Sequence, residues 1–132
     1  MLTYQQPSSP EFSVIVTCYN DGAYIEEAVQ SVLLSTFRNF EIIIVDDCST
    51  DPETINKLNS FANNGFHVLR KEVNKGVSDS RNKGIGESKG NYLLTLDADD
   101  RILPSYLEKS FEKLEEGYSV VYCNYKRFGL SD

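Results

Sequence analysis

The stretch that decides the fold is residues 40–52, FEIIIVDDCSTDP. Its first half is rich in Ile and Val and nearly all apolar, which is typical of a strand buried on both faces of a parallel sheet. Its end indicates a helix start, because Asp51 can accept hydrogen bonds from the free N–H groups of a first turn and Pro52 suits the first helical position. We therefore expect a buried strand over residues 40–46, two acids at its end, and a helix over residues 52–62.

The same alternation of short apolar segments and amphipathic segments runs along the whole chain. The other expected strands are residues 12–18, 66–70, 91–97 and 118–123, and the other expected helices are residues 23–35, 77–88 and 104–116. This order with short connections predicts an α/β fold, a mostly parallel sheet flanked by helices on both faces. Ligands of such sheets bind at the carboxyl ends of the strands, so the residues that follow each strand are the candidates for a site.

Composition excludes several classes of protein. Thirteen Lys and Arg against twenty Asp and Glu give a net charge of −7, which argues against a general nucleic-acid or anionic-membrane binder. Three cysteines, an odd number, favour free thiols in a reducing compartment, so we expect a cytoplasmic location. No apolar run approaches the roughly 20 residues that cross a bilayer. Residues 1–11 are polar and contain proline, and we expect a loose leader rather than a signal peptide.

Three acids, Asp97, Asp99 and Asp100, directly follow the apolar run of residues 92–96. Two like charges about 4 Å apart repel by roughly 4 kcal/mol at an effective dielectric constant of 20, so such a cluster favours a bound cation. Oxygen ligands without His or Cys select hard ions, which indicates Mg²⁺ or Mn²⁺ shared with substrate phosphates. The alternative is that one Asp caps the helix that begins near residue 104 and the others are solvated.

Polar side chains also follow the first two expected strands. Asp46 and Asp47 end the run that opened this section, and we expect Asp47 to accept a hydrogen bond from a base N–H or a ribose hydroxyl. Helix capping by residues 49–51, or a buried structural role for Asp46, is the competing interpretation. Tyr19 offers a flat ring for a base and Thr17 a hydroxyl beside it, although a core tyrosine is the alternative.

Residues 70–89 hold six of the thirteen positive side chains. Arg81 falls on the first turns of an expected helix, after the loop of residues 74–76, where it could hold a diphosphate. We expect most of the lysines in this segment to lie on a solvated helix face.

Four segments together resemble the N-terminal half of family 2 inverting glycosyltransferases. They are residues 12–20 (FSVIVTCYN), 44–49 (IVDDCS), 74–82 (NKGVSDSRN) and 96–100 (LDADD). The resemblance covers about residues 12–125 and implies a GT-A fold, cut short at its C-terminal side, with residues 126–132 as a tail and the acceptor-binding part absent. One departure is Ser80, where the family usually has Ala.

The resemblance implies a donor site for a nucleoside-diphosphate sugar, with UDP-sugar favoured. Substrate-binding residues would be Thr17, Tyr19, Asn20, Asp46, Asp47, Gly76, Arg81, Asp97 and Asp99. Residues 97–99 would be the DxD motif of the family, and Asp99 and Asp100 would hold the Mn²⁺ or Mg²⁺ ion. The acceptor hydroxyl would then attack the anomeric carbon with inversion.

That reaction needs a general base, and none is visible in this chain. The resemblance implies that the base lies in a later segment, beyond residue 132, and Asp132 is not a candidate for it. We therefore expect this chain alone to bind nucleotide sugar and metal but to turn over poorly. An anchor elsewhere in a longer protein would bring it to the inner face of a membrane. The apolar edge of residues 118–123 suggests a homodimer.

Two rival functions stay open at this point. A strand followed by Asp-x-Asp also occurs in haloacid-dehalogenase-like phosphotransferases, but there the motif normally follows the first strand, and here it follows the fourth. A non-catalytic nucleotide-binding or regulatory module is the more serious rival. A degenerate copy would be expected to lose acids, and this chain retains them.

Overall fold

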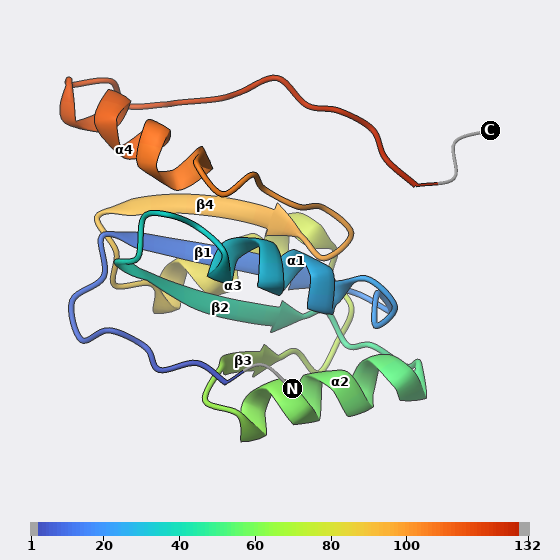
Figure 1. Cartoon of the computed structure of the whole chain (residues 1–132). Coiled ribbons are helices and arrows are strands. Elements are labelled where there is room, and N and C mark those ends of the chain that lie inside the picture. Colours follow the sequence, from blue (N-terminus) through green and yellow to red (C-terminus); the bar gives the residue numbers. More distant parts are fainter. Residues whose placement is uncertain (1–2, 130–132) are drawn as a thin grey trace.

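Four parallel strands form the sheet at the centre of the molecule, in the order β3-β2-β1-β4 (Figure 1). The computed structural model describes residues 3–129. The strands are β1 (Phe12–Cys18), β2 (Phe40–Asp46), β3 (His67–Arg70) and β4 (Tyr92–Asp97), and the helices are α1 (Ile25–Leu33), α2 (Pro52–Asn63), α3 (Val77–Glu87) and α4 (Tyr106–Glu115). The chain runs outward from β1 to β3 and then returns to the other side of β1. The order of the strands therefore reverses between β1 and β4, where open sheets of this type bind ligands.

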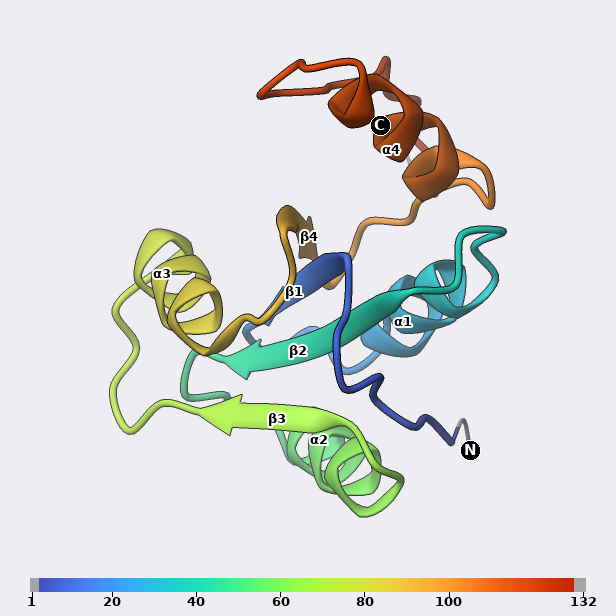
Figure 2. The same cartoon turned by 90° about the vertical axis from the view of Figure 1, so that its left-hand side faces the viewer.

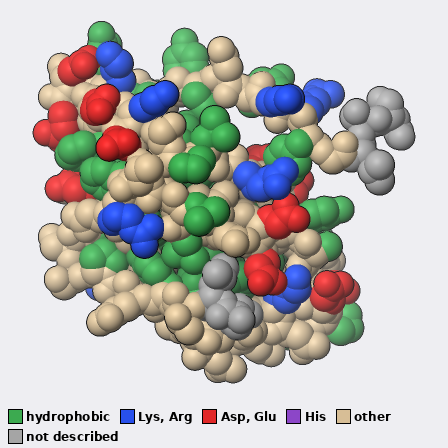
Figure 3. All heavy atoms as spheres, in the orientation of Figure 1, with side chains coloured by type: hydrophobic (Ala, Val, Ile, Leu, Met, Phe, Trp, Pro, Cys, Tyr) green, Lys and Arg blue, Asp and Glu red, His purple; other side chains and the backbone are tan. Residues whose placement is uncertain are grey.

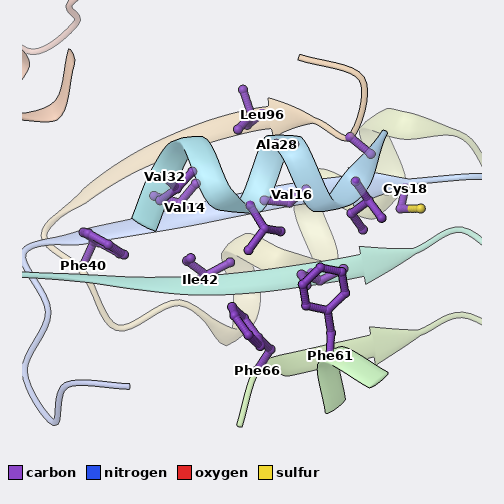
Figure 4. Close-up of a cluster of buried hydrophobic side chains, with 14 of the residues drawn as sticks. Val14, Val16, Cys18, Ala28, Val32, Phe40, Ile42, Phe61, Phe66 and Leu96 are labelled. Atoms are coloured by element: carbon purple, nitrogen blue, oxygen red, sulfur yellow. The ribbon is translucent and has the colours of Figure 1, made fainter. Parts of the chain in front are cut away.

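The two faces of the sheet are covered unequally (Figure 2). Side chains of β1 and β2 that alternate along each strand, such as Val14 and Ile42, pack with α1, α2 and α4 in the main core (Figure 4). The intervening side chains Ile15, Ile43 and Val45 form a smaller cluster beneath α3. Every residue of β1 and β2 is buried, which confirms the expectation of strands with two covered faces.

Helix α2 begins as the sequence indicates. The Asp51 carboxylate accepts a hydrogen bond from the Thr54 backbone N–H at 2.9 Å, and Pro52 is the first helical residue. All four helices end within two residues of their expected bounds. The expected α/β architecture is therefore confirmed.

Tyr4 and Gln6 pack against the sheet, although the sequence predicts a loose leader over residues 1–11. The Tyr4 ring stacks on Phe40 and Phe66, and its hydroxyl donates to the carbonyl of Phe40. The Gln6 amide donates to the Ile42 carbonyl at 2.8 Å and accepts from the Ile42 N–H at 3.1 Å. Strand β3 is short and leaves this part of the β2 edge unpaired, so a side chain completes the hydrogen bonding.

The expected fifth strand over residues 118–123 is wrong. This segment forms no strand, and Val120 and Tyr122 are 77% and 89% exposed. Figure 1 shows the segment running on from α4 without joining the sheet. An apolar segment becomes a strand only when a neighbouring strand supplies backbone partners, and within residues 3–129 none lies beside it. The homodimer expected through this segment stays a prediction.

No helix within the described part of the chain is both long and apolar enough to cross a membrane.

Candidate functional site

The polar residues that follow β1, β2 and β4 meet at one rim of the sheet. They line a pocket of about 180 Å³ formed by Thr17, Cys18, Tyr19, Asp21, Asp47, Val77, Ser80, Asp97 and Asp99. Thr17 pairs with Asp97 in the β1–β4 register, so the two face the same side of the sheet, the side covered by α3. The predicted convergence of strand ends is confirmed for Thr17, Tyr19, Asp47, Asp97 and Asp99.

Tyr19 lies at this rim and is 45% exposed, so it is not a core tyrosine. Its ring is available to a ligand.

Acidic side chains gather at two places on the face drawn in Figure 3, over α4 and on the side toward which the strands run, where Lys and Arg side chains lie among them. The rim therefore mixes both signs of charge.

Asp97 is held by two donors. The Thr17 hydroxyl donates to Oδ1 of Asp97 at 2.9 Å, and Nη2 of Arg81 donates to the same oxygen at 3.0 Å. Arg81 therefore reaches the site through Asp97 rather than by lining the pocket itself. Its Nε is buried and has no partner within residues 3–129, so the guanidinium keeps unused donors.

The acids after β4 are joined by Asp21, a carboxylate that the sequence prediction missed. Burial raises the pKa of Asp21, and the charges of Asp99 and Asp97 raise it further, while a hydrogen bond from the Tyr19 N–H opposes them. Burial and the same two charges raise the pKa of Asp100. The position of Asp21, three residues beyond the end of β1, is the signal that could have found it.

These acids do not form a complete metal cage. In the part of the chain that the structure describes, no three His, Cys, Asp or Glu side chains are grouped closely enough to hold an ion. The donor chemistry nevertheless fits a hard cation, because the charges of Asp97 and Asp99 raise the pKa of Asp21 and Asp100, and a positive ion among these carboxylates would relieve that repulsion. The arrangement therefore fits a site in which oxygen atoms of the protein would supply only part of the coordination of a metal ion.

Asp47 is almost fully buried and is surrounded by donors. Its Oδ1 accepts from Lys71 Nζ at 2.6 Å and from the Lys75 backbone N–H at 3.0 Å, and its Oδ2 accepts from the Gly76 N–H at 2.8 Å. Burial alone would raise the pKa of Asp47, but these hydrogen bonds and the charge of Lys71 outweigh burial and lower it. The carboxylate that faces the pocket is therefore ionised at neutral pH.

Lys71 is not the solvated lysine that the sequence suggests. Its side chain is 6% exposed, and Nζ also lies 2.6 Å from Asp79 Oδ2 and 3.2 Å from Ser80 Oγ. Sequence reasoning missed it because a run of cations does not reveal which one is enclosed.

Besides Arg81, three of the expected substrate-binding residues shape the rim without lining the pocket. Asp46 accepts from the N–H and hydroxyl of Ser49, which favours the structural alternative for this acid. Asn20 has a φ of 56° and accepts from the backbone N–H groups of residues 50 and 51, so it ties the loops after β1 and β2 together. Gly76 has a φ of 91°, which favours glycine, and is the N-cap residue of α3.

A parallel sheet whose strand order reverses beside an acid-lined pocket defines an α/β protein of the GT-A glycosyltransferase type. A family model described as "Glycosyl transferase family 2" matches residues 13–132, so the chain belongs to glycosyltransferase family 2.

Relatives and solved structures agree with this family. Glycosyltransferase GlyG of Streptococcus pneumoniae is 36% identical over 91% of this chain and 40% of that protein. The putative teichuronic acid biosynthesis glycosyltransferase TuaG of Bacillus subtilis is 40% identical over 85% of this chain and 48% of that protein. The chain thus spans less than half of the length of the first three curated relatives it matches, 36–48%.

Two solved structures share the fold. TarS of S. aureus, crystallised with UDP-GlcNAc, has a TM-score of 0.72 and 34% identity, covering 80% of this chain and 31% of that chain. A mannosyltransferase of Pyrobaculum calidifontis, in complex with GDP-Man and Mn²⁺, has a TM-score of 0.68 at 21% identity, covering 85% of this chain and 34% of that chain. The second likeness shows the fold alone.

Proposed function

We propose that this chain is the donor-binding half of an inverting glycosyltransferase and holds a nucleoside-diphosphate sugar, with UDP-sugar favoured. The observation that carries the proposal is the pocket at the ends of β1, β2 and β4, where Thr17, Asp47, Asp97 and Asp99 meet beside the half-exposed ring of Tyr19. An ionised Asp47 can only accept hydrogen bonds, which suits the N–H edge of a base. The UDP-GlcNAc complex of TarS supports uracil as that base.

The pyrophosphate would lie between the acids after β4 and the start of α3. Arg81 uses one N–H on Asp97 and keeps others for a diphosphate. We further propose that Asp99 and Asp100 hold Mg²⁺ or Mn²⁺, because oxygen donors without His suit these ions and such ions are usually shared with phosphates. When bound, the ion would neutralise charge on the departing nucleoside diphosphate.

The remaining part of the reaction belongs to residues outside this chain. We propose that the general base, which removes the proton of the acceptor hydroxyl, and most of the acceptor surface lie beyond residue 132. The length of the relatives supports this division, since the chain spans less than half of each of the first three. Within the chain, the task is to bind and orient the donor.

A melting experiment on the 132-residue chain tests the donor site. UDP with Mn²⁺ is compared with GDP, dTDP and Mn²⁺ alone. At a ligand concentration 100-fold above the dissociation constant, the expected stabilisation is about 2.7 kcal/mol, which is a shift of several degrees for a domain of this size.

Two variants separate the metal from general effects. Asp99→Asn should abolish the part of the UDP shift that depends on Mn²⁺, whereas Glu87→Gln, an exposed acid on α3, should leave it intact. If no nucleoside diphosphate shifts the melting temperature of the unaltered chain, the proposed function is wrong.

A further inference from the structure

The ammonium group of Lys71 is enclosed by protein, which is rare for a lysine side chain. It is buried between the end of β2 and the start of α3, although a buried charge is costly unless it is paired and hydrogen-bonded. Its partners are the carboxylates of Asp47 and Asp79 and the hydroxyl of Ser80, so all three of its donors have an acceptor. Two of the partners, Asp47 and Ser80, also line the pocket.

The backbone of this segment is fixed as well. The Lys71 N–H donates to the Asp46 carbonyl at 2.9 Å and thereby extends the pairing of β2 with β3 by one residue. The ammonium group is therefore carried on a backbone that the sheet itself holds in place. Its position does not depend on the nucleotide.

The consequence concerns how many hydrogen bonds Asp47 can still accept. Each carboxylate oxygen has about two acceptor positions. Oδ1 is filled by Lys71 and by the Lys75 N–H, while among residues 3–129 Oδ2 accepts only from the Gly76 N–H. One acceptor position therefore remains on the carboxylate that lines the pocket.

We propose that Lys71 is a positioning residue of the donor site, which occupies one acceptor position on Oδ1 of Asp47 and so leaves a single acceptor for the base. This inference rests on the proposed function. A single acceptor matches a base that presents one ring N–H between two carbonyl groups, as uracil does. Guanine presents two adjacent donors, a ring N–H and an amino group, and one of them would be left without a partner, which is costly in a desolvated site.

Removing the ammonium group should change both the strength and the pH dependence of binding. Asp47 forms an ion pair with Lys71, and Lys71 in turn forms an ion pair with Asp79. Without Lys71, burial would raise the pKa of Asp47 with less opposition, and Asp79 would no longer be separated from it by a cation. A protonated Asp47 presents an O–H where the base needs an acceptor, so binding should weaken as the pH falls.

Calorimetric titration of UDP into the 132-residue chain tests this at pH 7.5 and pH 5.5. Lys71→Met removes the charge and keeps the chain length, and Lys83→Met is the matched control, since Lys83 is an exposed lysine on α3. We expect Lys71→Met to lower UDP affinity about tenfold at pH 7.5 and further at pH 5.5. UDP itself gains a proton in this range, so the readout is the ratio of each variant to the unaltered chain at each pH. For Lys83→Met this ratio should stay near one.

The outcomes separate this inference from the function on which it rests. An unaltered chain that binds no nucleotide contradicts the proposed function. An unaltered chain that binds UDP while Lys71→Met matches the control at both pH values contradicts the role of Lys71.

If Lys71→Met does not melt cooperatively, Lys71→Gln keeps an N–H donor at this position and should show the same direction of change. The unaltered chain alone should also bind UDP more tightly than GDP, and the reverse order would overturn the single-acceptor argument.

Discussion

Replacing Gly84 by Ala should change the stability of the protein through two opposing effects, a gain in helix propensity and a loss of packing between α3 and the sheet. Gly84 lies within α3 and faces β1 and β2, where a Cβ would lie 2.4 Å from Ile15 Cγ2 and 3.1 Å from Val45 Cγ2. Carbon atoms in contact are ordinarily about 3.5–4.0 Å apart, so α3 would have to move away from the sheet by about 1 Å. Ile15 and Val45 are fully buried and β-branched, and neither can rotate out of the way.

The magnitude follows from the two opposing effects. Ala in place of Gly stabilises a helix interior by about 1 kcal/mol, whereas overpacking a rigid core costs about 1–3 kcal/mol. The contact with Ile15 is severe, so we take the upper end of the cost. We expect Gly84→Ala to lower the free energy of unfolding by about 2 kcal/mol.

Gly86 of the same helix supplies the control. A Cβ there meets no atom within 4 Å, so Gly86→Ala keeps the gain in helix propensity without the clash. It should raise the free energy of unfolding by up to about 1 kcal/mol. Urea denaturation followed by circular dichroism measures both variants. If Gly84→Ala is stabilised as much as Gly86→Ala, α3 does not pack on the sheet as closely as described, and the shape of the donor pocket must be reconsidered.

Two further predictions concern stability. The pKa of Asp47 is lowered in the folded protein, so its ionised form contributes stability that is present above the unfolded pKa of about 4 and is lost as the pH falls through the folded value. Urea midpoints measured at pH 3, 5 and 7 should therefore fall less steeply toward acid in Asp47→Asn than in the unaltered chain. Equal slopes for the two proteins would contradict this prediction. Gln6→Ala should lower the free energy of unfolding by about 1–2 kcal/mol, because two hydrogen bonds to the Ile42 backbone are lost. Gln5→Ala, at an exposed neighbouring position, is its control, and an equal effect of both changes would show that the edge of β2 does not need Gln6.

Much of the fold was predictable because its signals are local. The apolar run of β2 followed by Asp51 and Pro52 specifies a buried strand and a capped helix within a dozen residues. The segment 118–123 has the same apolar character as a strand, yet it remains unpaired. Strand formation depends on a neighbour that a local pattern does not encode.

The candidate site was predictable in part. Parallel strands bring their carboxyl ends to one rim, so Thr17, Asp47 and Asp97 could be expected together before any coordinates. Which of the adjacent acids faces the pocket was harder to decide. Successive side chains point to opposite sides of a strand, and Asp46 turns toward Ser49 whereas Asp47 turns toward α3.

By itself the sequence determined the order of strands and helices as far as α4, the acids at the strand ends and the resemblance to family 2 glycosyltransferases, because each depends on motifs of residues close together in the chain. Only the tertiary structure decided that Arg81 pairs with Asp97, that Asp21 joins the acids, and that Lys71 is enclosed behind Asp47. These contacts join segments far apart in the sequence. The packing of α3 on the sheet brings Lys71 and Arg81 to their carboxylate partners and buries these contacts. Burial in turn sets how strongly the charged groups interact.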